Sequence, residues 1–266
     1  MPEKFFMCRP TYFDVVYEIN PWMDVQNKPD KELAVKQWER LRQTYLDLGA
    51  IVEEVEPLPD LPDMVFTANA GLVFEKKFIP SRFKFQERQG EEPAFIRWFA
   101  EHGYEIVELP QGMTFEGEAD RILRHGKILV ANGFRTDATV PYEVGRLLGV
   151  DILRIKLVNP KFYHLDTCLA YFEDGDTVLY YPGAFDEESR EKIKKEFPRV
   201  IEAEDDEADR YVCNSINVGQ TIVMNQGCPK AQAELEKCGY KVVTLDMSEF
   251  LKSGGSIKCL TLKLGK

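Results

Sequence analysis

The pentapeptide Leu48-Gly49-Ala50-Ile51-Val52 joins the end of a predicted helix to a short hydrophobic strand, with a glycine at the junction. The same pattern, a helix-like run that stops at Gly or Pro before a strand, occurs five times at intervals of 41 to 54 residues. A period of this length indicates a repeated supersecondary unit. Five such units, none able to bury its apolar face alone, predict a ring closed around one axis. The other four copies are His102-Gly103-Tyr104-Glu105-Ile106-Val107, Leu148-Gly149-Val150-Asp151-Ile152-Leu153, Phe197-Pro198-Arg199-Val200-Ile201 and Cys238-Gly239-Tyr240-Lys241-Val242-Val243.

Each repeat also contains a helix and a strand-turn-strand segment. Asp30 is predicted to cap a helix whose apolar residues follow helical spacing up to Leu48. Further helices are predicted near 92–102, 141–148, 186–196 and 229–238, and hairpins at 69–79, 120–131, 166–181, 214–224 and 258–264. The last hairpin looks truncated, and residues 5–8 are expected to complete it and close the ring. The prediction is an α/β fold whose loops surround a central funnel.

Composition restricts the class of protein. At 266 residues without a Ser/Gly-rich or highly charged linker, a single domain is expected. The apolar runs are too short for a membrane span, the first residues lack a signal-peptide pattern, and a cytoplasmic, membrane-free protein is expected. A net charge of −11 argues against a nucleic-acid partner. The six cysteines show no metal-binding or redox spacing, so neither a zinc site nor a disulfide is expected in a reducing cytosol.

Three residue types at the predicted hub have catalytic potential. Of the three histidines, His102 is predicted at a helix end and His125 in a hairpin turn, whereas His164 lies at the mouth of a central strand. Cys259 follows a flexible Gly-Gly-Ser loop and has Lys258 beside it, which could favour the thiolate. Glu116 opens an acidic turn before another central strand. Each of these residues alone is more typical of a structural position.

Their joint position is what favours chemistry. Glu116, His164 and Cys259 each lie just before or within the inward hairpin of a different repeat. A cysteine, a histidine and a carboxylate form an activated nucleophile, a base and a group that orients the base. Asp166 follows His164 by two residues, so on a strand it would share the same face, where its carboxylate could bind a cation.

Four segments in this order resemble the guanidino-group-modifying enzymes, or penteins, which include arginine deiminases, dimethylargininases and amidinotransferases. They are Asp63-Met64-Val65-Phe66-Thr67-Ala68-Asn69, Glu116-Gly117, His164-Leu165-Asp166-Thr167, and the Gly-Gly-Ser-x-x-Cys segment at 254–259. The resemblance covers nearly the whole chain, including the fivefold repeat. It implies one catalytic domain over residues 1–266, built as a five-bladed α/β propeller of pseudosymmetric ββαβ repeats around an active-site funnel.

The resemblance also implies a role for each site residue. Cys259 would attack the guanidinium carbon, His164 would be the general acid and base, and Glu116 would pair with His164 and the substrate. Asp166 would hold the guanidinium nitrogens. No metal and no organic cofactor is implied. Two arginines are predicted to bind the substrate carboxylate, Arg88 in the loop after the first hairpin and Arg135 in an Arg-Thr-Asp turn.

One departure narrows the expected reaction. Deiminases and dimethylargininases typically carry Phe-Thr-Arg-Asp where this chain has Phe66-Thr67-Ala68-Asn69. Asn69 is neutral and lacks the negative charge with which an aspartate would hold a cation, but it could accommodate a neutral ureido intermediate. Together with residues 17–23, this looks most like the arginine dihydrolases, in which a second hydrolysis passes beyond citrulline. Asn20 is then a predicted substrate contact.

Alternatives remain open at this point. A deiminase or a dimethylargininase would stop at citrulline, and an amidinotransferase would require an amine acceptor. A ribosome-binding initiation factor shares the fivefold fold without being an enzyme, but such a protein has no reason to combine Cys259, His164 and Glu116 with an acidic charge. The expected partner is a small guanidino substrate, arginine. The oligomeric state is not predicted.

Overall fold

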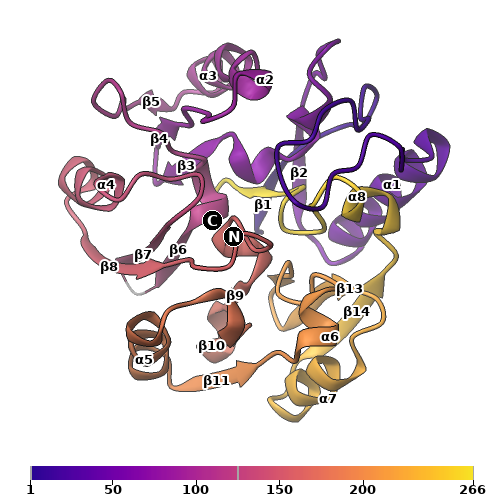
Figure 1. The fold of residues 1–266 in the computed structure, drawn as a ribbon, viewed down its shortest axis with the longest axis vertical. Coiled ribbons are helices and arrows are strands. Elements are labelled where there is room, and N and C mark those ends of the chain that lie inside the picture. The colour runs from indigo at the N-terminus through magenta and orange to yellow at the C-terminus, as the bar shows by residue number, and fades with distance from the viewer. Residues whose placement is uncertain (1, 125, 266) are drawn as a thin grey trace.

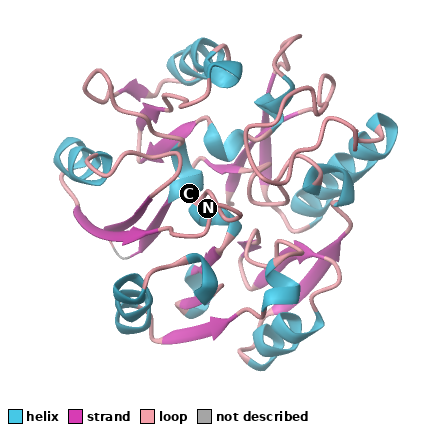
Figure 2. Ribbon diagram, viewed as in Figure 1, coloured by secondary structure: helices cyan, strands magenta, loops and turns pink. Residues whose placement is uncertain are grey.

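Five small mixed sheets surround a central axis in the computed structural model, which describes residues 2–124 and 126–265 (Figure 1). The longer helices lie on the outside of the ring, and both chain termini lie near its centre (Figures 1 and 2). The predicted five-bladed α/β architecture is confirmed. In this arrangement the segments that enter each sheet converge on the hub, where a site can form. The turn predicted at His125 lies outside the described residues.

Every sheet has three strands and follows one plan. An antiparallel hairpin is joined through a helix to a third strand that pairs in parallel with its middle strand, for example Leu72 opposite Ile79 and Phe78 opposite Ile106. The sheet orders are β15-β1-β2, β3-β4-β5, β6-β7-β8, β9-β10-β11 and β12-β13-β14. The strands are β1 (Lys4–Cys8), β2 (Ile51–Val55), β3 (Gly71–Phe74), β4 (Lys77–Pro80), β5 (Glu105–Ile106), β6 (Arg121–Arg124), β7 (Lys127–Asn132), β8 (Asp151–Lys156), β9 (Leu169–Phe172), β10 (Thr177–Tyr180), β11 (Arg199–Glu202), β12 (Ile216–Val218), β13 (Thr221–Asn225), β14 (Lys241–Leu245) and β15 (Leu262–Lys263).

The two ends of the chain complete one blade together. β15 pairs antiparallel with β1, with Phe5 opposite Lys263, and β1 pairs in parallel with β2. This confirms the expected closure of the ring by the N-terminal strand. The consequence is that residues near position 259 lie beside residues near position 68, although almost two hundred residues separate them. Ala68 donates its backbone N–H to the carbonyl of Cys259 at 3.1 Å.

The predicted helices all form, with boundaries shifted by one or two residues. Asp30 caps the first, accepting from the Leu33 N–H at 3.0 Å, and Gly149 ends the third with a φ of +68°, which favours glycine. The predicted helices are α1 (Lys31–Asp47), α3 (Glu92–Glu101), α4 (Val140–Leu148), α5 (Glu187–Glu196) and α7 (Pro229–Lys237), with shorter α2 (Gln86–Gln89), α6 (Asp205–Ala208) and α8 (Ser248–Leu251). Within the described ranges, no helix is long and apolar enough to cross a bilayer.

The buried hydrophobic side chains form clusters between neighbouring blades. In one of them Trp38 and Leu41 of α1 pack with Phe5 of β1 and Val223 of β13, and all four are fully buried. Burial of this kind contributes roughly 1.5–3 kcal/mol for each large apolar side chain. Because each cluster joins adjacent blades, the ring is stabilised by contacts between neighbours, and the hub is left to polar side chains.

The hub is held by hydrogen bonds between turns of neighbouring blades. The residues that precede each inner strand lie in short turns, including 3₁₀ turns at Thr67–Asn69, Gly117–Asp120 and Leu165–Thr167. His164 and Asp166 are therefore not on a strand, and the period-two argument that placed them on one face was wrong. The linking bonds run from Asn69 Nδ2 to Glu116 O (3.1 Å), from Leu165 N to Asp120 Oδ1 (3.1 Å), from Asn214 Nδ2 to Asp166 O (2.9 Å) and from Cys259 N to Asn214 Oδ1 (3.1 Å).

Candidate active site

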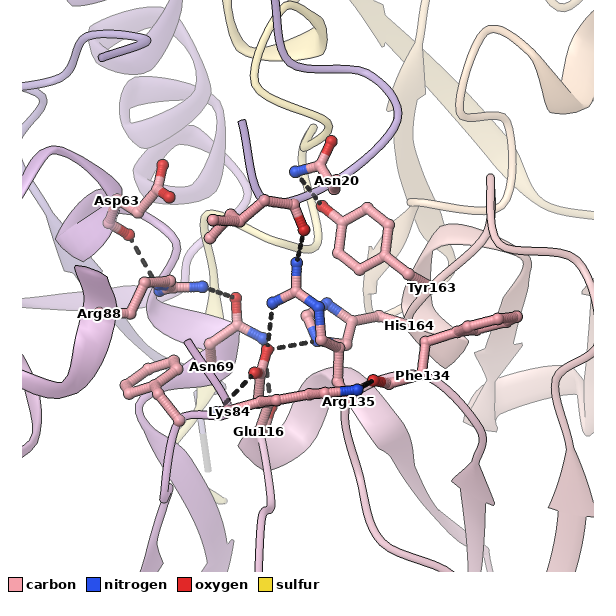
Figure 3. A network of polar contacts seen from close by, with 12 residues as sticks. Asn20, Asp63, Asn69, Lys84, Arg88, Glu116, Phe134, Arg135, Tyr163 and His164 are labelled. Carbon is pink, nitrogen blue, oxygen red and sulfur yellow. Dashed lines mark hydrogen bonds and ion pairs between the residues drawn. The ribbon is translucent and has the colours of Figure 1, made fainter. Parts of the chain in front are cut away.

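A small pocket opens among the loops of the hub. Its volume is about 10 Å³, which is room for a single water molecule. Six of the eight predicted site residues line it, and Glu116 lies directly beside them through bonds to three of these residues. Asn69, Arg88, Arg135 and His164 converge there, opposite Asn20 (Figure 3). The six lining residues are Asn20, Asn69, Arg88, Arg135, His164 and Cys259.

Glu116 joins the predicted base to one of the predicted carboxylate-binding arginines. Its Oε2 lies 2.8 Å from His164 Nε2 and accepts from Arg135 Nη1 at 2.9 Å (Figure 3). Burial opposes ionisation, but the Arg135 guanidinium and then His164 lower the pKa of Glu116 to about 2. Since an ionised carboxylate only accepts, Nε2 of His164 carries the proton, which leaves Nδ1 to exchange protons with a substrate.

Arg135 lines the pocket and is held on several sides. Its guanidinium lies 4.7 Å from the ring centre of Tyr163 and 4.5 Å from that of Phe85, and Nη2 donates to the Ile19 carbonyl at 2.8 Å. It is thus bound as a guanidinium would be, by a carboxylate, a carbonyl and two aromatic faces. Another cation could take this Glu116 oxygen only by displacing Arg135.

Arg88 lies on the short helix α2 rather than in the predicted loop. It is buried and forms two hydrogen bonds with the Glu91 carboxylate, both of 2.8 Å, while Nη1 donates to Asn69 Oδ1 at 2.9 Å. Burial raises the pKa of Glu91 to about 7, and Arg88 opposes that shift. Both ends of the Asn69 amide are therefore held, because its Oδ1 accepts from Arg88 and its Nδ2 donates to the Glu116 carbonyl.

The segment before α1 covers the pocket. Asn20 donates through Nδ2 to the Ser253 carbonyl at 3.0 Å and to the Tyr163 hydroxyl at 3.3 Å. The same hydroxyl donates to the Gly254 carbonyl at 2.6 Å. These bonds join residues near position 20 to the loop that precedes Cys259. The predicted contact residue Asn20 therefore lines the pocket, beside Tyr163 (Figure 3).

Cys259 lies in a tight turn and is 5% exposed. A Cβ on Gly255 would lie 2.3 Å from the Phe66 ring, so the loop requires glycine at that position. Burial and then the charge of Asp166 raise the pKa of the thiol well above its ordinary value, whereas the Ser256 backbone and Asn214 lower it. The expected helper Lys258 points elsewhere: its Nζ pairs with Glu118 at 3.0 Å.

Asp166 does not line the small pocket. It lies on the wall of a second cavity of about 400 Å³ at the end of the hub where the hairpins turn, together with Lys258 and Glu118. Within the part of the chain that the structure describes, neither carboxylate oxygen has a hydrogen bond of ordinary geometry. The side chains of Cys259 and Asn214 nevertheless lie close enough to interact with this carboxylate and to lower its pKa. Burial raises the pKa of Asp166 to about 7, against the effect of Lys258. His164 and Asp166 thus face different cavities, which corrects the expectation of a shared face.

The raised pKa of Asp166 predicts a pH-dependent change in stability. The folded protein holds the Asp166 proton more tightly than the unfolded chain does. The stability that this proton contributes is therefore fully present below about pH 4 and is lost as the pH rises through about 7. Asp166→Asn, which has no proton to lose, is expected to gain roughly 1–4 kcal/mol of unfolding free energy relative to the wild type between pH 4 and 8. Urea unfolding at several pH values measures this difference.

The matched control for this prediction is Asp186→Asn. Asp186 caps α5, accepting from Ser189 N–H at 2.9 Å, and although burial opposes it, the Ser189 hydrogen bonds lower its pKa. Its contribution is lost as the pH falls, so the control variant should not gain stability toward pH 8. A difference between Asp166→Asn and wild type that is the same at every pH would contradict the prediction.

The structure adds three residues to those predicted. Asp63 lines the pocket and accepts from the Tyr17 hydroxyl at 3.0 Å and the Ser253 hydroxyl at 3.2 Å. Tyr163 lies under the Arg135 guanidinium, and Asn214 donates to Cys259 Sγ at 3.1 Å. Asp63 and Tyr163 stand within or next to the motifs that carried the resemblance. Asn214 precedes the inner strand of its repeat, as Asn69 and Asp166 do in theirs. This equivalence in the repeat is the sequence feature that could have predicted Asn214 as a site residue.

No group of three His, Cys, Asp or Glu side chains is placed to hold a metal ion among the residues that the structure describes. Cys259 and His164 line one pocket, and Glu116 orients His164 from behind. This arrangement can deliver a nucleophile and a proton to a planar, positively charged group.

Comparison with known proteins identifies relatives along the whole chain. The family described as N,N dimethylarginine dimethylhydrolase, eukaryotic, matches residues 2–266. The bifunctional arginine dihydrolase/ornithine cyclodeaminase ArgZ of Synechocystis sp. is 42% identical over 98% of this chain, which spans 37% of that relative's length. The N(G),N(G)-dimethylarginine dimethylaminohydrolase of Mycobacterium tuberculosis is 39% identical over 98% of this chain and 85% of its own length.

The fold is also found in solved structures. The N-terminal domain of ArgZ, as a cysteine-to-serine variant bound to its substrate, superposes with a TM-score of 0.94 at 39% identity, and the alignment covers 98% of each chain. A dimethylarginine dimethylaminohydrolase shares the fold with a TM-score of 0.82 at 22% identity. The chain belongs to the N,N-dimethylarginine dimethylhydrolase family, within the guanidino-group-modifying, or pentein, superfamily.

Proposed function

We propose that residues 1–266 form a single catalytic domain, a cysteine-dependent guanidine hydrolase that converts arginine to ornithine, two molecules of ammonia and carbon dioxide. The observation that carries this proposal is the pocket in which Cys259, the Glu116–His164 pair and the neutral Asn69 meet. The 42% identity to ArgZ, whose name includes arginine dihydrolase, supports the choice of reaction. The six free cysteines are consistent with action in the reducing cytoplasm.

The first half-reaction replaces one nitrogen by oxygen. His164 takes the thiol proton of Cys259 on Nδ1 as the sulfur forms a bond to the guanidinium carbon, and it passes that proton to a terminal nitrogen as the C–N bond breaks and ammonia departs. His164 then removes a proton from water, whose oxygen bonds to the same carbon. The carbon–sulfur bond breaks, its electron pair returns to sulfur, and citrulline remains bound.

The second half-reaction repeats these steps on the neutral ureido group: a second ammonia departs, water adds, and the sulfur leaves a carbamic acid on the side-chain nitrogen. The remaining C–N bond of that carbamic acid then breaks, which gives ornithine and carbon dioxide. Asn69 is suited to this half-reaction, because an amide can donate as well as accept and does not demand a positively charged partner. In the structure, Asn69 accepts from Arg88 and donates to the Glu116 carbonyl. An aspartate at this position could not make the second bond. The chain thus has a hydrogen-bonding reason to carry an asparagine there.

The arginines provide the charge that the substrate carboxylate needs. Arg135 and Arg88 line the pocket, each paired with an internal carboxylate. In this proposal the substrate guanidinium takes over Glu116, and the released Arg135 turns to the substrate carboxylate. Asn20, which also lines the pocket, contacts the same end of the substrate. Because the closed pocket holds only about 10 Å³, binding requires this exchange.

The decisive experiment counts products. The purified protein is incubated with arginine, citrulline and ornithine are separated by chromatography, and ammonia is measured for each arginine consumed. Ornithine with two ammonia molecules per arginine is the expected result. Citrulline as the only end product, with one ammonia, would rule out the dihydrolase assignment and leave a deiminase.

Changing Asn69 to aspartate is expected to redirect the products. The added negative charge favours the guanidinium over the neutral ureido group, and the donor to Glu116 is lost. Asn69→Asp should therefore slow the second hydrolysis more than the first, by roughly 10-fold or more, so that citrulline accumulates. The product ratio measures the effect. The control is Asn217→Asp in β12, a residue that does not line the pocket, and it should leave the ratio unchanged. An unchanged ratio in Asn69→Asp would contradict the role of the amide.

The second candidate is a dimethylargininase, favoured by the family match and by the 39% identical enzyme of Mycobacterium tuberculosis. Under that function the leaving group would be a methylated amine and the product citrulline. Competition between arginine and asymmetric dimethylarginine distinguishes the two. A kcat/KM for dimethylarginine above that for arginine would favour the second candidate.

A further inference from the structure

Asn214 is a fully buried asparagine that contacts the Cys259 sulfur. Its Nδ2 donates to Sγ at 3.1 Å and to the Asp166 carbonyl at 2.9 Å, while its Oδ1 accepts from the Cys259 backbone N–H at 3.1 Å. The orientation of the amide is assigned by these partners, because a backbone N–H requires the oxygen on its side. The NH₂ group therefore has to face the sulfur.

The backbone around Asn214 is held on both sides. Its N–H donates to the Tyr211 carbonyl at 2.9 Å, and Lys258 N–H donates to its carbonyl at 3.3 Å. Tyr211 itself has a φ of +59°, an uncommon conformation for a residue other than glycine. Asn214 and Cys259 therefore belong to two turns that are bonded to each other through both backbone and side chain. The amide cannot rotate away from the sulfur without breaking these bonds.

The surroundings of the sulfur otherwise oppose a thiolate. Burial and Asp166 raise the pKa of Cys259, and the nearby phenols of Tyr163 and Tyr211 have pKa values raised well above ordinary by burial, so they remain neutral. His164 lines the same pocket and is bonded to Glu116. Asn214 and the Ser256 backbone are the groups that lower the pKa of the thiol. Of these, Asn214 supplies the side-chain donor.

We propose that Asn214 is a further catalytic residue, whose amide NH₂ group holds the Cys259 sulfur and stabilises its thiolate form. The inference rests on the proposed function for its use in turnover, since the same electron pair attacks the guanidinium carbon. The Asn214 amide acts again when the carbon–sulfur bond breaks and the electron pair returns to the sulfur. A thioether accepts a hydrogen bond weakly, so the bond from Asn214 favours the thiolate over the covalent adduct in each hydrolysis.

The first test is the pH dependence of alkylation. Iodoacetamide is applied over a pH series, and modification of Cys259 is followed by peptide mass spectrometry, which separates it from the other cysteines. Asn214→Ala is expected to move the midpoint of the reaction to higher pH and to lower kcat/KM by about 10- to 100-fold. An alkylation profile identical to that of the wild type, in a folded variant, would overturn the proposal.

The matched control is Asn225→Ala. Asn225 is also buried and also joins two backbone groups, donating to the Arg210 carbonyl at 2.8 Å and accepting from Met247 N–H at 3.2 Å, but it does not line the pocket. It should leave the alkylation midpoint unchanged. A shift of equal size in this control would show that the effect is structural and would count against a catalytic role for Asn214.

A measurement on the wild type covers the case in which Asn214→Ala fails to fold. The side-chain amide resonance of Asn214, assigned by NMR, should move with pH at the same midpoint as Cys259 alkylation, and this movement should be absent in Cys259→Ala. A resonance that does not follow the thiol would contradict the contact. Both readouts are independent of turnover, so a failure of the arginine assay would affect the proposed function and leave this test intact.

Discussion

Replacement of Cys259 by alanine is expected to lower arginine turnover by roughly 10⁴- to 10⁶-fold. The reason is that the proposed mechanism has no other nucleophile: Cys259 is the thiol that lines the pocket beside His164. The wild type, quenched in acid during turnover, should also show a mass increase on the peptide that contains Cys259. Cys259→Ala should show no adduct. Initial rates and peptide mass spectrometry provide the two measurements.

Cys213→Ala provides the matched control for this prediction. Cys213 is a free, buried thiol that packs in the cluster between β10 and β13 and does not line the pocket. Its removal should cost some stability but should leave kcat near the wild-type value. If folded Cys259→Ala kept even a tenth of wild-type turnover, covalent catalysis would be excluded for this protein, whichever guanidine it acts on.

Replacement of His164 by asparagine is expected to lower kcat by roughly 10²- to 10⁴-fold. The imidazole is proposed to give a proton to ammonia and to take one from water, and Glu116 holds it in position through the 2.8 Å contact with Nε2. Asparagine retains a hydrogen bond to Glu116 but exchanges no proton. Initial rates measured across pH should show that the ionisation assigned to the base in the wild type is absent from the variant.

His102→Asn is the matched control for the histidine. His102 follows α3, stacks on Trp98 with ring centroids 3.8 Å apart, is exposed, and does not line the pocket. It should leave kcat unchanged. A His164→Asn variant with a normal rate and a normal pH profile would show that another group transfers the protons, and the acid–base role would have to be reassigned.

The sequence was informative wherever the repeat made positions equivalent. Five helix stops predicted five blades, and the places of Glu116, His164 and Cys259 before inner strands predicted a shared centre. Two of these residues line one pocket and the third bonds to His164. Such predictions work because helix ends, turns and short strands are encoded by neighbours in the chain, and a ring brings equivalent positions together.

The directions of hub side chains were harder to predict. Asp166 was expected to face the same side as His164, but the segment forms a 3₁₀ turn, and its carboxylate lines the cavity on the hairpin side. Lys258 likewise pairs with Glu118 instead of assisting Cys259. A short polar segment is compatible with a strand or a turn, and the choice is made by hydrogen bonds to the neighbouring blade.

The amino-acid order thus established the fivefold α/β ring, the family and the set of candidate catalytic residues, because these depend on local periodicity and on motifs. Only the folded ring decided that Arg135 rests on Glu116, that Asp166 turns to the second cavity and that Asn214 holds the sulfur. Each of these contacts joins side chains from different segments at the hub. Their geometry depends on the closure of the ring, and closure requires both ends of the chain.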